Sequence, residues 1–99
     1  MSELIFEHSH IEENGDIIEM RIWRVPVSDT NPEGIAYSCA YARGGKRLIG
    51  YDNENHGKET SNHHKHIKDR IVPYQFVDER RLAEDFAEDI DKIKRGMIR

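Results

Sequence analysis

Apolar and polar positions alternate along the first half of the chain with a period of two residues, which is typical of half-buried β-strands. The segments 4–11, 17–27, 35–42 and 46–52 show this pattern or a strand-like composition, and a fifth extended segment covers about 63–76. Asn14-Gly15 and the stretch RGGK suit tight turns between them, because these residues accept positive φ angles. Consecutive strands joined by short turns predict an antiparallel β-meander of about five strands.

The last quarter of the chain changes to a helical period. Its apolar residues are spaced by four, four, three and four positions, which draws one stripe along a helix: Leu82, Phe86, Ile90, Ile93 and Met97. We expect Asp78 to cap the N-terminus of this helix and Gly96 to end it. The helix is expected to pack on one face of the sheet, which gives an α+β fold of two layers.

Length and composition indicate one domain that spans residues 1–99, with no second core. Cys39 is the only cysteine, which excludes a disulfide framework and a cysteine-type zinc cluster, and we expect it to be buried in a strand. The acidic N-terminus lacks the basic region of a signal peptide, and no apolar run is long enough to span a membrane. We therefore expect a cytoplasmic protein.

Charge is distributed unevenly along a chain of net charge −4. Residues 1–42 carry two basic and eight acidic side chains, residues 43–70 seven and four, and residues 71–99 six and seven. The middle segment is therefore basic before any histidine is protonated, and it holds four of the six histidines. This pattern indicates a local anion-attracting site on an acidic protein.

The sequence HHKH lies inside this basic segment. In an extended strand His64 and His66 project from one face, whereas His63 and Lys65 project from the other. Two imidazoles about 6.5–7 Å apart at their Cα atoms suit two proton-transfer groups beside one phosphate, or two ligands of one metal. A solvated histidine-rich loop is the third interpretation. If segment 46–52 pairs with HHKH, Asp52 could accept a hydrogen bond from an imidazole and fix its tautomer; Asx-type loop initiation is the alternative.

Several widespread motifs are absent from the sequence. It contains no GxxxxGK[ST], GxGxxG, HExxH or CxxC, so nucleotide-binding loops and common zinc sites have no support.

The stretch AYSCAYARGGKRLIGYDNENHGKETSNHHKHI, followed by a short acidic amphipathic helix, resembles the small toxins of the TumE family. The shared features are an extended Y-S strand, the pattern G-K-R-x-I-x-Y-D-N and a downstream H-H-x-H. The upstream GDIIEMRIWRVP also resembles the family, so the likeness covers most of the chain. It implies the toxin of a toxin–antitoxin system, with a helix-turn-helix antitoxin as partner and suspected ribonuclease action. The stretch ENHGKETSN departs from the pattern and leaves the role of His56 open.

These observations favour a metal-independent endoribonuclease that needs no cofactor and acts on RNA. The acid–base pair is assigned to His64 and His66, which can each transfer a proton near neutral pH. Arg47 is expected to bind the phosphate, and Asp52 to orient an imidazole. Four further residues are counted as substrate-binding: Lys58, Tyr51, Asn53 and His63. Tyr51 could stack on an unpaired base or belong to the core.

Two alternatives use the same region differently. A metal-binding hydrolase would take its ligands from His64, His66, Asp52 and His56. An interaction module without chemistry would dock RNA or an acidic protein on the basic face. The sequence leaves open whether the protein forms a homodimer.

Overall fold

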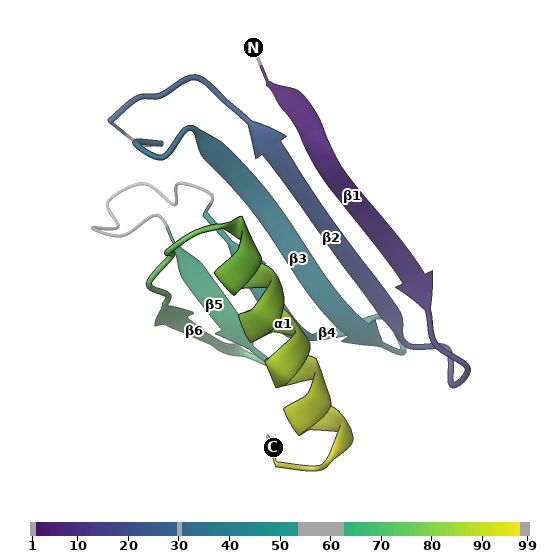
Figure 1. The fold of residues 1–99 in the computed structure, drawn as a ribbon. Helices are drawn as coiled ribbons and strands as arrows, with labels where there is room; N and C mark the ends of the chain where they lie inside the picture. The colour runs from purple at the N-terminus through teal and green to yellow at the C-terminus, as the bar shows by residue number, and fades with distance from the viewer. Residues whose placement is uncertain (1, 30, 54–62, 98–99) are drawn as a thin grey trace.

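The computed structural model describes residues 2–29, 31–53 and 63–97. Its strands follow one another in space in the same order as in the sequence, and each pair of neighbours is antiparallel (Figure 1). The elements are β1 (Glu3–Ile11), β2 (Ile17–Arg24), β3 (Ile35–Arg43), β4 (Lys46–Asp52), β5 (His64–Ile67), β6 (Arg70–Pro73) and α1 (Glu79–Lys94). The predicted α+β meander with a C-terminal helix is therefore confirmed.

The described residues contain six strands rather than about five, because the extended segment after residue 62 is divided in two. Lys68, at φ 55°, turns the chain so that Ile67 pairs with Arg70. Asp69 is a common turn residue, but the sequence gives no sign that Lys68 takes the positive φ angle of this hairpin. Strand β6 ends at Pro73, which cannot donate a hydrogen bond to a further ladder.

Helix α1 begins and ends where the sequence predicted. The Asp78 carboxylate accepts the Arg81 N–H at 2.8 Å, and Gly96 adopts φ 71° just after the helix. The predicted apolar stripe is buried over four of its five members: Leu82, Phe86, Ile90 and Ile93. Met97 is 65% exposed, because it follows the end of the helix and no longer continues the stripe.

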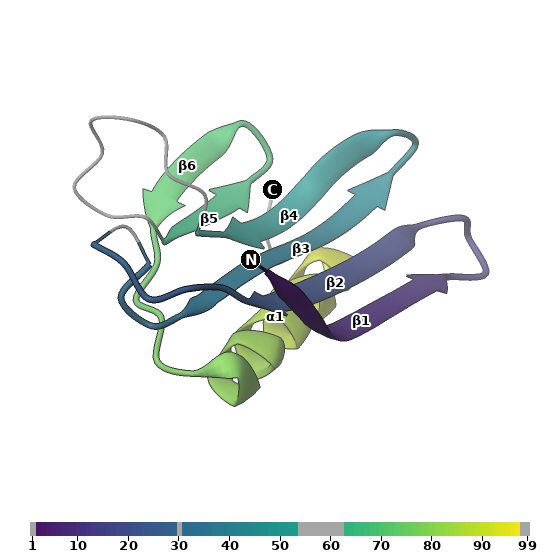
Figure 2. The same ribbon diagram turned by 90° about the horizontal axis from the view of Figure 1, so that it is seen from above.

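The helix lies across one face of the sheet, as Figure 2 shows from above. We call this the helix-covered face and the opposite side the open face. The core lies between helix and sheet, and the strands contribute Met20, Ile22, Tyr37, Cys39, Tyr41, Ile49 and Tyr51. Burial raises the pKa of the Cys39 thiol to about 12, so it stays protonated at neutral pH. The expectation of a cysteine buried in a strand is confirmed.

Polar contacts also hold the helix on this face. The Lys65 ammonium lies 2.7 Å from the Asp89 carboxylate, which also accepts a hydrogen bond from the Tyr51 hydroxyl. The Tyr74 hydroxyl donates to Asp85 at 2.6 Å. Lys65 therefore points away from its neighbours His64 and His66, as strand alternation predicted.

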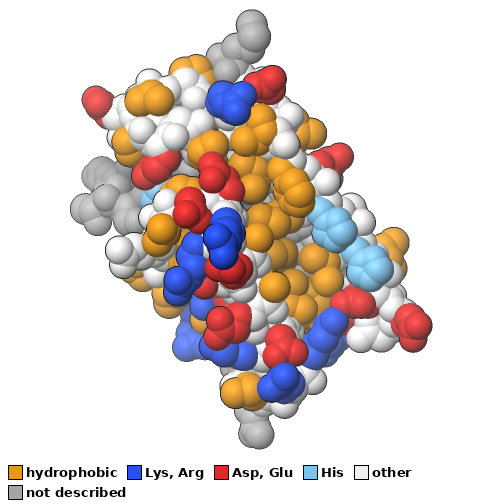
Figure 3. All heavy atoms as spheres, viewed as in Figure 1, with side chains coloured by type: hydrophobic (Ala, Val, Ile, Leu, Met, Phe, Trp, Pro, Cys, Tyr) orange, Lys and Arg blue, Asp and Glu red, His pale blue; other side chains and the backbone are white. Residues whose placement is uncertain are grey.

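The helix does not cover the β1–β2 hairpin completely. Apolar side chains remain visible between α1 and this hairpin in Figure 3, and Ile5, Phe6 and Ala83 help to line a groove of about 270 Å³ there. No helix in the described part of the chain is long and apolar enough to cross a membrane.

Candidate functional site

Strand register places three predicted site residues in neighbouring positions on the open face. Asp52 pairs with His64 across the β4–β5 ladder, and Gly50 pairs with His66. On the other side of β4, Asp52 is opposite Ser38. Because directly paired residues share a face, the side chains of Asp52, His64 and His66 gather on the side that α1 leaves uncovered.

The Asp52 carboxylate lies between the two imidazoles. Its Oδ2 is 2.8 Å from Nε2 of His66, and its Oδ1 is 3.9 Å from Nδ1 of His64. His64 is 5% exposed and His66 is 6% exposed, while Asp52 is half-buried. A carboxylate in this position fixes the tautomer and orientation of the ring that it binds. We call these three residues the His–Asp cluster.

Arg47 lies flat on the same face because Gly50 leaves room for it. A Cβ atom added to Gly50 would be 2.9 Å from Cδ and 3.1 Å from Nε of Arg47. Any larger residue at position 50 must therefore displace the arginine. Arg47 is exposed and makes no ion pair with another residue in the described part of the chain, so its guanidinium can bind an anion.

A pocket of about 530 Å³ opens beside the His–Asp cluster. Asp52 and Arg47 form part of its wall, and Trp23, Ala36 and Ser38 form much of the rest. We call it the Trp23 pocket. It combines an aromatic ring, a cation and a carboxylate next to two imidazoles, which is a suitable environment for an anionic, aromatic ligand.

The structure does not bring Tyr51 and His63 to this cluster. Tyr51 is 1% exposed on the helix-covered face, where burial and its hydrogen bond to Asp89 raise the pKa of the phenol. The His63 ring stacks on Phe76 at 5.1 Å, and its Nδ1 lies 2.8 Å from the Tyr37 hydroxyl. Neither ring faces the Trp23 pocket with a surface on which a base could stack.

Asn53 lines the Trp23 pocket, but its amide is used inside the protein. Its Oδ1 accepts the Tyr37 N–H at 3.0 Å, and its Nδ2 donates to the Ile35 carbonyl at 2.6 Å. Asn53 thus ties the end of β4 to the start of β3 and supports the pocket wall. The predicted Lys58, and His56 of the alternative metal site, lie outside the described residues.

No three His, Cys, Asp or Glu side chains within 2–29, 31–53 and 63–97 are arranged to hold a metal ion. Of the alternative ligand set, His64, His66 and Asp52 lie close together, and His56 lies outside the described residues.

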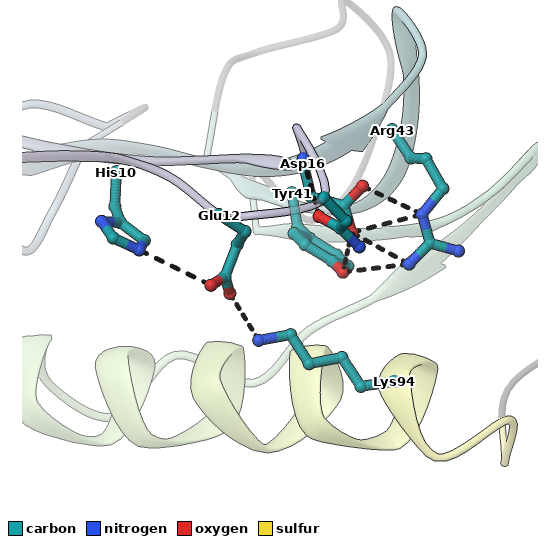
Figure 4. A network of polar contacts seen from close by, with 7 residues as sticks. His10, Glu12, Asp16, Tyr41, Arg43 and Lys94 are labelled. Carbon is teal, nitrogen blue, oxygen red and sulfur yellow. Dashed lines mark hydrogen bonds and ion pairs between the residues drawn. The ribbon is translucent and has the colours of Figure 1, made fainter.

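A second polar network joins the β1–β2 hairpin to β3 (Figure 4). Asp16 is 1% exposed and accepts hydrogen bonds from the Tyr41 hydroxyl at 2.5 Å and from Nη2 of Arg43 at 2.9 Å. The hydrogen bonds from Arg43 and then Tyr41 hold the pKa of Asp16 well below its usual range. The carboxylate is saturated by partners from its own chain, so the network stabilises the fold rather than offering a site.

The same network reaches the helix through Glu12. Glu12 pairs with Lys94 near the end of α1, and Nε2 of His10 lies 3.5 Å from the Glu12 carboxylate (Figure 4). The hydrogen bond with Glu12 raises the pKa of Lys94. This contact fixes the C-terminal end of the helix to the hairpin.

A comparison with known families identifies the chain. The family model described as Toxin TumE matches residues 1–94, which is nearly all of the 99 residues of the sequence. The chain belongs to the TumE toxin family. No curated protein and no solved structure matches it. The family membership shows a toxin of a toxin–antitoxin system, and it implies an antitoxin as partner.

Sequence reasoning about this TumE-family toxin missed Trp23. A usable signal was present in residues 36–42, where small side chains alternate with two tyrosines and a cysteine. The bulky set is buried under the helix, and the small set forms the floor beneath Trp23. A strand with large residues on one face and small residues on the other predicts a filled side and a hollow side.

Proposed function

We propose that this TumE-family toxin is a metal-independent endoribonuclease whose acid–base groups are His64 and His66. The observation that carries the proposal is the Asp52 carboxylate, which lies 2.8 Å from one imidazole and 3.9 Å from the other. Arg47 lies beside them on the same face, exposed and supported by Gly50. Two proton-transfer groups, an orienting carboxylate and a cation are the groups that RNA cleavage requires without a metal.

The reaction follows from the chemistry of RNA. One imidazole removes the proton of a ribose 2′-OH, and the 2′-oxygen then attacks the adjacent phosphorus. The bond from phosphorus to the 5′-oxygen of the next nucleotide breaks, and the other imidazole gives that oxygen a proton. The products are a 2′,3′-cyclic phosphate and a 5′-hydroxyl end. No oxidant, metal or further reactant is needed.

Each charged neighbour has a part in this scheme. Asp52 stabilises the imidazolium that forms when a histidine accepts the proton. The Arg47 guanidinium stabilises the charge that builds on the phosphorane oxygens, and it can bind two of them at once. Because both imidazoles are almost buried, the phosphate would reach the cluster through the Trp23 pocket, whose wall includes Arg47 and Asp52.

Replacement of the two histidines tests the proposal. Cleavage of single-stranded RNA by His64→Gln or His66→Gln should fall by about 100- to 10,000-fold, the usual contribution of one acid or base. His10→Gln is the matched control, since it removes an exposed imidazole on β1 that does not contact the cluster. Melting temperatures identify variants that fail to fold. Wild-type activity in both cluster variants would overturn the proposal.

Chelation and pH separate the proposal from a metal hydrolase. Cleavage should persist in EDTA and should pass through a maximum between about pH 6 and 8, because one imidazole must be neutral and the other protonated. Loss of activity in EDTA that added metal restores would favour the metal site instead. A flat pH profile would contradict two cooperating imidazoles.

The antitoxin partner is proposed to be a helix-turn-helix protein that covers the basic region formed by residues 43–70. Opposite charges would make association fast and sensitive to salt. The two proteins should co-purify from a cell that makes both, and the complex should not cleave RNA. Arg47→Glu should slow association several-fold at low salt, whereas a complex insensitive to this change would place the antitoxin elsewhere.

A further inference from the structure

We propose that the Trp23 pocket is a nucleobase-binding subsite, in which a base of single-stranded RNA stacks on the indole of Trp23. The inference rests on the proposed function, since it places the nucleotide next to the phosphate that the His–Asp cluster would cleave. It adds a substrate-recognition residue, Trp23, that neither sequence reasoning nor the family assigns.

The floor of the pocket is made of small side chains. Ala36 and Ser38 of β3 lie on the open face between Trp23 of β2 and Asp52 of β4. Trp23 is directly opposite Ala36, and Asp52 is directly opposite Ser38. A methyl and a hydroxymethyl group are too short to fill the space between the larger side chains on each side, which leaves the hollow of about 530 Å³.

Trp23 has the placement of a stacking residue. It is half-buried on the open face, and its cross-strand partner Ala36 is too small to cover an indole. The core is on the other face, so the indole does not take part in it. An aromatic ring that lines a solvent-open pocket offers a π-face to any base, and such stacking is a principal source of affinity for single strands.

The two sides of the pocket differ in charge, because the Trp23 side is neutral and the other side holds the Arg47 guanidinium and the Asp52 carboxylate. On the Trp23 side, the Arg21 guanidinium is paired with Glu7 at 2.8 Å and with Glu19 at 3.0 Å. On the other side, Arg47 makes no ion pair among the described residues. A nucleotide has the same division, with an uncharged base at one end and an anionic phosphate at the other.

The spacing favours one unstacked nucleotide over a duplex. Trp23 and Asp52 are two strands apart and offset by two residues along the strands, which puts their Cα atoms roughly 12 Å apart. Their side chains share one pocket, so a base at Trp23 would be joined to a phosphate at the cluster by a single sugar. A base in a helix is stacked on its neighbours and cannot enter, so the substrate class is single-stranded RNA.

Trp23 is the only tryptophan of the chain, so its fluorescence reports on this pocket directly. The probes are four homopolymeric tetranucleotides with 2′-O-methyl groups, which cannot be cleaved because the 2′-oxygen carries no proton. Each should change the fluorescence of the wild-type protein in a saturable way, and ribose 5-phosphate, which has no base, should not. An equal change with ribose 5-phosphate or with inorganic phosphate would overturn the subsite.

Three variants measured with fluorescein-labelled versions of the same oligomers sharpen the test. Trp23→Ala should weaken binding about 10-fold or more, and Trp23→Phe should retain most of it. Ala36→Leu should weaken binding comparably by filling the pocket without removing a polar group. Leu4→Ala is the control, because Leu4 is the other cross-strand neighbour of Trp23 but does not line the pocket. Wild-type affinity in both Trp23→Ala and Ala36→Leu would overturn the inference.

Failure of the subsite and failure of the proposed function have different signatures. Binding that depends on Trp23, with normal cleavage by His66→Gln, would support the subsite and contradict the catalytic assignment. If cleavage depends on His66 but the folded Trp23→Ala variant keeps full activity and affinity, the catalytic assignment is supported and the subsite is contradicted.

Discussion

The two faces of the sheet come from alternate residues of the same strands, yet they differ in how space and charge are used. On the helix-covered face, Tyr41, Ile49 and Tyr51 are almost fully buried against α1. On the open face, the corresponding positions of β3 and β4 hold Ala36, Ser38 and Gly50, and a pocket replaces the core. One face is filled for stability, and the other is left hollow.

The buried and half-buried carboxylates of the two faces also have different partners. Asp89 on the helix-covered face is enclosed by Lys65 and the Tyr51 hydroxyl, and both contacts fasten the helix. Asp52 on the open face lies between two imidazoles, the groups to which we assign proton transfer in the proposed reaction. Burial, together with the Asp89 contact, raises the pKa of Tyr51, so this phenol stays a hydrogen-bond donor. Within β5 alone, Lys65 serves the fold, and its neighbours His64 and His66 form the candidate site.

Asp52→Asn should produce the largest effect on the open face. The amide cannot stabilise an imidazolium as the carboxylate does, so RNA cleavage should fall about 100- to 10,000-fold. The melting temperature should change little by comparison. Rates from a gel assay with a labelled oligonucleotide, measured beside thermal melts, check both parts. An Asp52→Asn protein that cleaves normally would remove the difference between the two faces.

Phe86→Ala should have the converse effect on the helix-covered face. Removal of a buried ring from the core should lower the free energy of unfolding by about 3–5 kcal/mol. Urea unfolding measures this loss, and the cleavage rate per folded molecule should stay within about threefold of wild type. A rate that falls far more than the folded fraction would show that the helix also shapes the site.

Lys65→Met tests whether the two faces of β5 have different roles, one in stability and the other in cleavage. It leaves the buried Asp89 carboxylate without its cation, which should cost about 1–3 kcal/mol of stability. Cleavage should be preserved, because the lysine points away from the cluster. A double variant with Asp89→Asn should lose less than the sum of the two single losses. Independent losses would mean that the ion pair does not fasten the helix.

Gly50→Ala tests the placement of Arg47 without removing its charge. The new methyl group would lie 2.9 Å from Cδ of Arg47, so the side chain must move off the sheet. We expect the KM for RNA to rise by about tenfold, the effect of losing one well-placed charged contact. Arg47→Lys, which keeps the charge but not the planar fork, is the comparison. No change in KM would mean that Arg47 binds substrate from another position.

Asp16→Asn is expected to have the smallest effect on cleavage, because Asp16 belongs to the second polar network, but its effect on stability should depend on pH. Because the pKa of Asp16 is lowered in the folded state, its contribution is fully present above its unfolded pKa of about 3.9 and is lost as the pH falls further. The melting temperatures of variant and wild type should therefore converge below about pH 4. A constant difference down to pH 2.5 would contradict a depressed pKa.

Much of the fold followed from local rules. Period-two alternation, the Asn14-Gly15 turn and the spacing of Leu82, Phe86, Ile90 and Ile93 depend only on neighbours along the chain. The β5–β6 hairpin was not predicted, because the sequence gives no sign that Lys68 takes a positive φ angle. Local patterns predict an element when the residues themselves prefer it, and they fail where tertiary pairing imposes the conformation.

Part of the candidate site also followed from local rules, and part depended on the tertiary structure. Alternation predicted that His64 and His66 share a face and that Lys65 does not, because this depends only on the pleat of one strand. Alternation could not tell whether Tyr51 and His63 are buried, since a face of the sheet becomes core only when the helix packs on it. The position of Trp23 beside Asp52 depends on the order of the strands, which brings β2, β3 and β4 side by side.

The amino-acid sequence by itself determined the first four strands, the helix with its caps, and the placement of two imidazoles on one side of β5, because these follow from backbone geometry and nearest neighbours. The tertiary structure alone decided which face α1 covers, since both faces of β2 are apolar near Ile17 and Ile18. That choice buried Tyr51, left the small residues of β3 uncovered, and placed Trp23 and Arg47 around one pocket with Asp52 of the His–Asp cluster.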